Sequence, residues 1–418
     1  MPGLSGRIER VDWDGNQAWS YTRLGLHHDI EPLPNGNILM LGAEELSTEE
    51  QIALGRDPAR ATKGLKLDYL VELKPEGREG GTIVWEWRMK NHLVQDFDRA
   101  KKNYGIVSDH VGEVDINFIE NPKAETSSNL RVLQSLGYVS SGAKFTPQSG
   151  SADWTHANSV AYHKGLDQIM LSLRSLSEIW IIDHSTTTAE AAGASGGKRN
   201  MGGRILYRWG NPQAYQSGSP ADQMLFGQHD AQWIGEGTAG EGNILIFNNG
   251  EGRKDGQYSS IEEIRPPLKS DGSYERIERE AFGPTETAWR YVSEKREDFS
   301  SDVLSGVQRL LNGNTLICSG TQGRVFEVTR DGDTVWEQKI DITMRPRGGA
   351  RRPGGAGGAG PRRRPGMRPG VAGAAAGGGA NDALAGGGAL FRATRYGLDH
   401  PAFGGRLLES INSGTVGK

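Results

Sequence analysis

The sequence is short of the features that define several large classes of protein. Cys318 is the only cysteine among 418 residues, so no disulfide can form within the chain, and its apolar neighbours predict a buried structural thiol. No stretch reaches the length of about 18 apolar residues that a membrane-spanning helix needs. The net charge of −4 is too close to neutral to indicate a nucleic-acid or membrane partner. What remains is a globular protein with a substantial core.

Two segments lack something more local. The first 15 residues, MPGLSGRIERVDWDG, contain no apolar core of the kind a signal peptide needs. No acidic residue lies between Asp341 and Asp382, where Gly, Ala, Arg and Pro dominate. Such a composition cannot bury enough apolar surface to offset the entropy of ordering. We therefore expect a disordered insert over 345–388, with binding of an anionic polymer such as RNA as the alternative. We expect 1–344 to form the main domain and 389–418 to pack back on it.

The sequence is rich in glycine and tryptophan, with 60 Gly and ten Trp. It also contains a repeated unit. The clearest unit, FGQHDAQWIGEGTAGEGNILIFNNG at 226–250, joins a His-Asp pair to a loop and an apolar strand. Related units are HDIEPLPNGNILML from His28, SGVQRLLNGNTLIC from Ser305 and the looser HANSVAYHKGLDQIMLS from His156. Units of this kind with glycine turns predict an all-β fold, a β-propeller with long inserted loops. A β-sandwich is the alternative, but it would not explain equivalent residues that recur in each repeat.

Hairpins and loops complete the units. GRIERVDWDGNQAWSY at 6–21 parallels GRVFEVTRDGDTVWEQ at 323–338, and both predict two short strands around an Asp-Gly turn. No inner strands precede the first copy, which favours a truncated start over ring closure by the C-terminal end. We expect 91–152 to be a long inserted loop and Ser185–Gly203 a flexible one.

The repeat places His28, His156 and His229 at the heads of inner strands, and Arg174 ends the strand after His156. A propeller presents such positions to its channel, so we expect the three imidazoles to converge there beside the guanidinium. One interpretation is a metal site, because His is the commonest metal ligand, although the arginine disfavours a cation. A second is a site for a tetrahedral oxyanion, sulfate or phosphate, in which Arg supplies paired donors and a neutral His is nucleophile or acid–base. The third is a set of histidines that are simply hydrogen-bonded in the core.

Several long segments closely resemble one family: DWTHANS, SLRSLSEIWIID, ILYRWGNPQAY, FGQHDAQW, GNILIFNNG and SGVQRLLNGNTLICSG. They are similar to the bacterial arylsulfotransferases, which transfer a sulfuryl group between phenols without the nucleotide donor PAPS. The resemblance implies a six-bladed propeller and a ping-pong reaction through a sulfohistidine. It implies no cofactor and no metal, and small-molecule partners: a phenolic sulfate ester as donor and a phenol as acceptor. It also implies a periplasmic or secreted protein. The family's preceding β-domain and disulfide are not found here.

The resemblance also implies roles for individual residues. His229 is expected to be the nucleophile, with Arg174, His28 and His156 completing the catalytic set and His27 able to exchange roles with His28. Turnover is expected to fall as the pH drops through about 6–7, where imidazole protonates. Two other functions stay open, an aryl-sulfatase-like hydrolase and a non-catalytic binding propeller. Substrate contacts are expected from His27, Asn158, Asn248, Trp154 and Trp233, with packing in the core or rim as the alternative for the tryptophans.

Overall fold

The structure, a computed structural model, describes residues 5–119, 153–342, 389–397, 400 and 403. Its regular elements are mainly strands, and four sheets have four strands each. The first sheet contains β3 (Leu26–Pro32), β4 (Ile38–Leu46), β5 (Leu65–Pro75) and β6 (Gly81–Arg88). The second contains β9 (Ala157–His163), β10 (Gln168–Leu173), β11 (Glu178–Asp183) and β12 (Ile205–Trp209). The third contains β13 (His229–Trp233), β14 (Ile244–Asn248), β15 (Ser260–Ile264) and β16 (Trp289–Tyr291). The fourth contains β17 (Gly306–Arg309), β18 (Thr315–Ser319), β19 (Arg324–Val328) and β20 (Thr334–Lys339).

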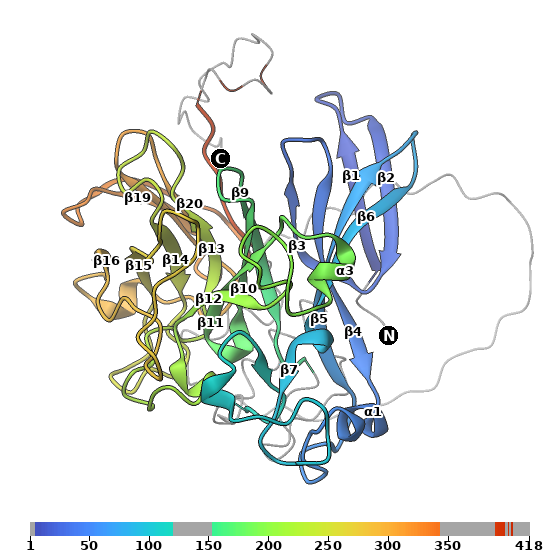
Figure 1. Ribbon diagram of the computed structural model, residues 1–418. Helices are drawn as coiled ribbons and strands as arrows, with labels where there is room; N and C mark the ends of the chain where they lie inside the picture. The colour runs from blue at the N-terminus through green and yellow to red at the C-terminus, as the bar shows by residue number, and fades with distance from the viewer. Residues whose placement is uncertain (1–4, 120–152, 343–388, 398–399, 401–402, 404–418) are drawn as a thin grey trace, which may run out of the picture.

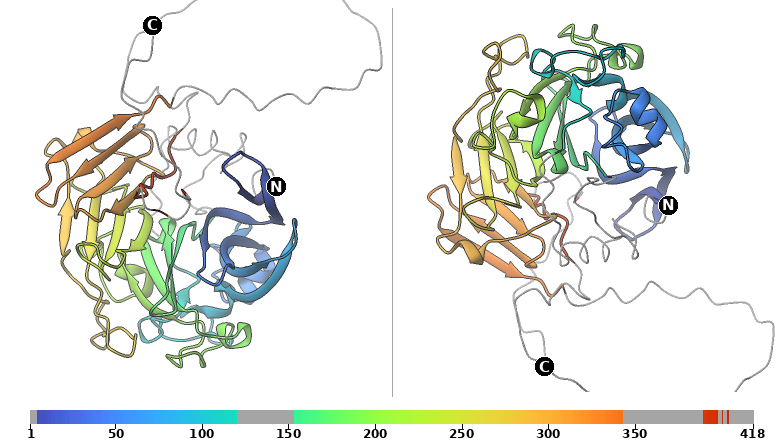
Figure 2. Two further views of the ribbon diagram at one scale, coloured as in Figure 1. Left: turned by 90° about the horizontal axis from the view of Figure 1, so that it is seen from above. Right: turned by 90° about the horizontal axis from the view of Figure 1, so that it is seen from below.

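The four sheets are arranged as blades around a common centre (Figure 2). Within each sheet the strands pair antiparallel in chain order, so each blade is a meander. Contacts between β3 and β9, between β9 and β13, and between β13 and β17 join the first strands of neighbouring blades. These first strands therefore line the centre of the molecule, as in a propeller. The predicted all-β propeller is confirmed.

A two-stranded hairpin precedes the first blade (Figure 1). It consists of β1 (Ser5–Val11) and β2 (Gln17–Leu24), which confirms the hairpin predicted at 6–21. The Trp19 indole donates to the carbonyl oxygen of Gly80 over 2.9 Å, which ties the hairpin to the turn before β6. Within the described residues there are thus four complete blades and one hairpin. A count of six blades stays an expectation from the family resemblance.

The repeated Asn-Gly-Asn motif has a structural cause. In the first and fourth blades its glycine, Gly36 or Gly313, turns the chain with a φ of 86°, which suits a residue without a side chain. The asparagine that follows donates its amide to a glutamate on the third strand, Asn37 to Glu72 and Asn314 to Glu327. Two buried or half-buried polar groups thereby satisfy one another. The motif closes the hairpin and holds the third strand, so its recurrence reflects folding rather than catalysis.

The core lies between the blades. In β10, Ile169 and Leu171 pack toward the first blade, whereas Met170 between them packs toward the third. Strand side chains alternate between the two faces, so a blade that is covered on both sides needs apolar residues at every position. The β10 sequence QIMLSL is buried throughout, and its two polar side chains, Gln168 and Ser172, are hydrogen-bonded. Each such aliphatic side chain contributes about 1.5–3 kcal/mol on burial.

Hydrogen bonds from backbone amides to side-chain oxygens join the first strands of successive blades. The Asp29 carboxylate accepts from the amide of Val160 over 3.1 Å. The Ser159 hydroxyl accepts from the amide of Ala231 over 3.2 Å, and the Asp230 carboxylate accepts from the amide of Val307 over 2.8 Å. One such hydrogen bond thus connects the first blade to the second, another the second to the third, and another the third to the fourth. It fixes the positions of β3, β9 and β13, which carry the candidate histidines.

Part of the C-terminal segment, 389–397, lies in the centre of the molecule (Figure 2). The guanidinium of Arg392 is 2.8 Å from Asp29 and 3.4 Å from Asp230, so it bridges the first and third blades. The amide of Leu390 donates to Gly320 over 3.1 Å, and Arg395 pairs with Glu327. The predicted insert at 345–388 lies outside the described residues.

The expected loops are partly structured. The described part of 91–152 contains a two-stranded parallel sheet of β7 (Leu93–Val94) and β8 (Val114–Asp115). The segment 185–203, expected to be flexible, instead contains the short helix α3 (Thr188–Ala191), which a Thr187–Glu190 capping box begins. Arg199 in this segment forms a buried ion pair with Asp183 over 3.1 Å. Specific polar contacts therefore order a stretch whose composition predicted flexibility. Helix α1 (Thr48–Ala53) follows β4, and none of the helices in the described residues is long and apolar enough to cross a membrane.

Candidate active site

The three predicted histidines and the predicted arginine come together near the centre. His28 lies in β3, His229 begins β13, His156 immediately precedes β9, and Arg174 immediately follows β10. The rings of His28 and His156 are 4.6 Å apart between centroids, at 62° to each other. Burial, together with the positive charges of Arg174 and His156, lowers the pKa of His229 to about 3. Such coupling requires that all these groups lie close together.

The backbone positions of the histidines are less equivalent than the repeats predict. Val160 in β9 and Ala231 in β13 are equivalent, because each donates its amide to the first strand of the preceding blade, and His229 lies two residues before Ala231. His156 lies four residues before Val160, so the prediction of one shared place is wrong for His156. Its ring still reaches the cluster. His156 and His28 both have a left-handed backbone, with φ of 50° and 53°, which is rare for side-chain-bearing residues and is concentrated at functional sites.

His229 is buried, with 3% of its surface exposed, and its hydrogen bonds define a single tautomer. Its Nδ1 lies 2.8 Å from the Asn249 side-chain oxygen and 3.2 Å from the Gly227 carbonyl oxygen. The Asn249 amide nitrogen donates to the carbonyls of Ser301 and Leu304, so its oxygen faces His229 as an acceptor. Nδ1 must therefore carry the hydrogen. Nε2, which accepts from the Leu304 amide over 3.2 Å, keeps the lone pair.

His156 and Arg174 are each paired with a carboxylate. The Nδ1 of His156 is 2.8 Å from Asp153 Oδ2, and a guanidinium nitrogen of Arg174 is 2.6 Å from Glu251 Oε2. Burial alone would raise the pKa of Asp153, but the charge and hydrogen bond of His156, together with the charges of His27 and Lys66, outweigh burial, and the pKa is lowered. The Nε of Arg174 is buried with no hydrogen-bond partner among the described residues. An anion in the cluster would satisfy this donor.

His28 is linked to its neighbour His27. The Nδ1 atoms of the two rings are 2.9 Å apart, and His27 Nε2 is 3.0 Å from Asp68 Oδ1. Burial lowers the pKa of His28 well below 6.5, and the nearby His156, His27 and His229 lower it further. His28 is therefore neutral near neutral pH.

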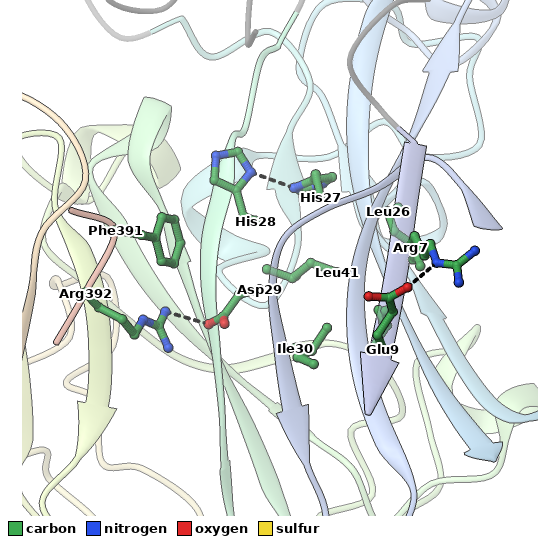
Figure 3. A pocket seen from close by; sticks show the side chains of 12 residues that line it. Arg7, Glu9, Leu26, His27, His28, Asp29, Ile30, Leu41, Phe391 and Arg392 are labelled. Atoms are coloured by element: carbon green, nitrogen blue, oxygen red, sulfur yellow. Dashed lines mark hydrogen bonds and ion pairs between the residues drawn. The ribbon is translucent and has the colours of Figure 1, made fainter. Parts of the chain in front are cut away.

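A cavity of about 540 Å³ opens next to His28, between β1, β3 and the C-terminal segment (Figure 3). Phe391 and Arg392 line it opposite the strands. His229, His156 and Arg174 are not among its lining residues, so His28 is the member of the cluster that lines the cavity. In the part of the chain that the structure describes, no group of three or more His, Cys, Asp or Glu side chains has the geometry to hold a metal ion.

A family model described as arylsulfotransferase (ASST) matches residues 5–343 of this chain. The chain belongs to the arylsulfotransferase family. That range includes all four members of the cluster and every complete blade of the structure. It ends before the C-terminal segment that lies in the centre of the molecule.

Two curated relatives are similar to part of this family member. Arylsulfate sulfotransferase AssT of Escherichia coli O6:H1 (strain CFT073) is 25% identical over 209 residues, 46% of this chain and 33% of that protein. The enzyme of the same name from Lelliottia amnigena is 25% identical over 183 residues, 42% of this chain and 29% of that protein. The matched region thus spans about a third of the length of these relatives.

Solved structures show a more remote likeness. The periplasmic gluconolactonase PpgL of Pseudomonas aeruginosa is 10% identical, with 80% of this chain and 78% of that chain covered and a TM-score of 0.32. Virginiamycin B lyase of Staphylococcus aureus is 9% identical, with 80% and 59% covered and a TM-score of 0.30. Neither likeness bears on activity.

The remaining predicted site residues lie around the cluster or away from it. Asn158 donates to the carbonyl of Gln228, next to His229, over 2.7 Å. Both functional groups of Asn248 bind the backbone of the loop before β13, at Phe226 and Met224. The indole of Trp154 donates to Phe118, and Arg56 stacks on its ring. Trp233 lines a second cavity of about 230 Å³ at the far end of β13 from His229.

The groups that orient the candidate catalytic residues were not predicted from the sequence. Asn249, Asp153 and Glu251 contact His229, His156 and Arg174, and none of them was predicted. A signal existed for Asn249, which stands beside Asn248 in the Asn-Asn-Gly turn. The expected loss of turnover at pH 6–7 also does not follow from His229. Its pKa of about 3 keeps the ring unprotonated through that range.

Proposed function

We propose that this protein transfers a sulfuryl group from a phenolic sulfate ester to an acceptor phenol through a covalent intermediate on His229, without PAPS. The observation that carries the proposal is the tautomer of His229. Asn249 and Gly227 hold the hydrogen on Nδ1, so Nε2 keeps its lone pair. A neutral imidazole with such a lone pair is the form that attacks sulfur.

The first step exchanges one contact of Nε2 for another. In the structure the Leu304 amide donates to Nε2 over 3.2 Å, and this long hydrogen bond must open before Nε2 reaches the donor's sulfur. Leu304 and Ser305 both have left-handed backbones, with φ of 59° and 86°. Such conformations cost about 1–3 kcal/mol each, so movement of this turn releases strain. Nε2 then bonds to sulfur as the bond from sulfur to the phenolic oxygen breaks.

Arg174 is proposed to bind the sulfuryl oxygens. Glu251 holds one terminal nitrogen of the guanidinium at 2.6 Å, which fixes the plane of the side chain. Its buried Nε has no partner among the described residues and is available for an oxygen of the sulfuryl group. Preorganised donors of this kind stabilise charge that develops in the transition state. His156, oriented by Asp153, is the second group placed to contact these oxygens.

His28 is proposed to serve the leaving phenol. It lies where the buried cluster meets the cavity of about 540 Å³, so the aryl group of donor or acceptor has space beside it. A phenoxide has a parent pKa of about 10, so a proton delivered during bond cleavage helps it to leave. In the second half of the reaction the same residue takes the proton of the acceptor phenol.

The test is a donor–acceptor assay on purified protein. We expect nitrophenol release from nitrophenyl sulfate to accelerate when phenol is added, with phenyl sulfate as the new product. Incubation with donor alone is expected to add one sulfuryl mass to the peptide that contains His229, stable to alkali and lost in acid. Release that does not respond to phenol, with sulfate as the product, would instead identify an aryl-sulfatase-like hydrolase.

A further inference from the structure

A line of polar side chains leads from the buried face of the first blade to His28. Asp68 in β5 is 2% exposed, and its Oδ2 accepts from the Thr155 hydroxyl over 2.6 Å and from the Ala157 amide over 2.9 Å. Its Oδ1 lies at an ion-pair distance of 3.0 Å from His27 Nε2. His27 Nδ1 in turn lies 2.9 Å from His28 Nδ1 (Figure 3). The second blade therefore orients Asp68, which in turn orients His27.

One hydrogen must lie between the two Nδ1 atoms, because two lone pairs at 2.9 Å would repel. Burial lowers the pKa of His27, but the hydrogen bond and charge of Asp68, assisted by Asp153 and the Gly42 carbonyl, outweigh burial and raise it above 6.5. The pKa of His28 moves the opposite way. The hydrogen therefore belongs to His27, and neutral His28 carries its own hydrogen on Nε2.

We propose that Asp68 and His27 are positioning residues that make His28 the proton donor to the leaving phenol and replenish its proton through the Nδ1–Nδ1 contact. This inference rests on the proposed function and adds two residues to it. His27 thus acts through His28 and does not exchange roles with it.

The proton movements balance over the two half-reactions. As the bond from sulfur to the aryl oxygen breaks, Nε2 of His28 gives its hydrogen to that oxygen, and Nδ1 of His28 takes the hydrogen of His27 Nδ1. His27 is left neutral, with its remaining hydrogen on Nε2 facing Asp68. When an acceptor phenol attacks the sulfohistidine, its proton goes to His28 Nε2 and the hydrogen on His28 Nδ1 returns to His27.

The relay solves a chemical problem that His28 has by itself. A neutral imidazole is a very weak acid unless its other nitrogen gains a proton at the same time. Charging His28 beforehand is unfavourable because it is buried and faces His156 and His229, with only Asp153 opposing them. Delivery through His27 avoids a charged His28. In His229, by contrast, Nδ1 faces an acceptor, so Nε2 of the neutral ring carries a lone pair.

The leaving group supplies the test. With nitrophenyl sulfate the phenoxide leaves without much help, whereas with phenyl sulfate it needs the proton. We expect His27→Gln to lose about a hundredfold in kcat on phenyl sulfate, the usual contribution of general acid catalysis, and less than about fivefold on nitrophenyl sulfate. With phenyl sulfate, wild-type turnover should also fall as the pH rises through the folded pKa of His27, and this alkaline limb should be absent from the variant.

A matched control separates the relay from general damage. His163→Gln changes a histidine in β9 whose ring contacts Leu166 and Trp233 instead of the relay, and it should keep the wild-type ratio between the two donors. Asp68→Asn should behave like His27→Gln. If Asp68→Asn fails to fold because the Ala157 contact is lost, His27→Gln alone decides. Equal losses on both donors would overturn the relay and leave the sulfuryl transfer intact.

A measurement that does not depend on turnover completes the test. Nitrogen NMR of protein labelled at histidine should show His27 doubly protonated at pH 7 and His28 neutral with its hydrogen on Nε2. Assignment comes from the His27→Gln and His28→Gln variants. A His28 hydrogen on Nδ1 would overturn the relay even in a protein that turns over no aryl sulfate. If the protein turns over no aryl sulfate but the two histidines have the expected tautomers, only the proposed function is contradicted.

Discussion

Two histidines of this protein, the buried His229 and the half-buried His184, are placed in opposite states by their neighbours. His184 lies between Asp167 at 2.9 Å and Glu72 at 2.9 Å, one carboxylate at each ring nitrogen. His229 lies between neutral acceptors, Asn249 and Gly227, and a backbone donor, with Arg174 nearby. Burial disfavours the charged ring at both places. At His184 the two carboxylates outweigh burial and raise the pKa, whereas at His229 Arg174 adds to burial and the pKa falls to about 3.

The comparison shows that burial alone does not decide what a histidine does. A ring held charged between carboxylates joins structural elements, here the first blade and the second, and has no lone pair to offer. A ring held neutral by an amide keeps a lone pair and is suited to attack. The partners, which come from different strands, distinguish a structural histidine from a candidate nucleophile.

The largest expected effect is the loss of sulfuryl transfer when the candidate nucleophile His229 is removed. His229→Ala should lower phenol-to-phenol transfer by about a thousandfold or more, because a covalent nucleophile is removed. His184→Gln should retain transfer within about threefold under conditions where it is folded, because His184 lies outside the cluster. Initial rates with nitrophenyl sulfate and phenol measure both. Robust transfer by His229→Ala would remove the covalent mechanism.

A second prediction concerns the cation beside His229. Arg174→Lys should lower kcat by about a hundredfold, because an ammonium cannot both hold Glu251 and present a second directed donor to the sulfuryl group. Glu251→Gln is the matched variant, since it keeps the shape of the partner but weakens its hold, and a smaller loss is expected. Steady-state kinetics of the two variants give the comparison. Wild-type kcat in Arg174→Lys would exclude Arg174 from the transition state.

The pH dependence of turnover is a third test of the proposed difference in protonation state between His229 and His184. Because the pKa of His229 is lowered to about 3, turnover with nitrophenyl sulfate should stay level from pH 7 down to pH 5. It should fall only at lower pH, where the ring takes a proton and loses its lone pair. Tryptophan fluorescence at each pH checks that the protein remains folded. A fall centred at pH 6–7 would show that His229 is not held neutral as described.

Protein stability should respond to pH in opposite directions at the two sites. The folded pKa of His184 is raised above 6.5, so its contribution is fully present below pH 6.5 and is lost as the pH rises through the folded value. His184→Gln should therefore lower the free energy of unfolding by about 2 kcal/mol at pH 6, as for a hydrogen bond to a charged group. The loss should shrink at pH 9. Urea titrations at the two pH values measure it, and a loss that grows with pH would contradict the charged state of His184.

The smallest expected effect is the opposite pH dependence of stability that His229 produces. Its folded pKa lies below its unfolded value, so the unfolded chain takes up a proton below pH 6.5 that the folded protein refuses. Stability is therefore lost as the pH falls from 6.5 toward 3. His229→Gln removes this proton uptake, so its stability relative to wild type should be more favourable at pH 5 than at pH 7. An unchanged difference between the two pH values would show that His229 titrates alike in both states.

Much of the fold could be predicted from the repeats. The Asn-Gly-Asn turns, the apolar strands and the hairpin at 6–21 are local patterns, and local hydrogen bonds such as that from Asn314 to Glu327 produce them. The order in 185–203 could not be predicted, because it depends on Arg199 reaching Asp183 in a neighbouring strand. Composition describes the residues of such a segment but not the partners that they meet.

By itself the sequence determined which chemical groups are present and roughly where they lie: three histidines near the heads of inner strands and an arginine after β10. Only the tertiary structure decided their protonation states. A pKa depends on burial and on charges within a few ångströms, and those charges come from distant parts of the chain. Asp68 reaches His27 from two strands away, Asn249 reaches His229 from the end of β14, and Glu251 reaches Arg174 from the next blade. No local pattern encodes these meetings, because they form only when the blades pack around one centre.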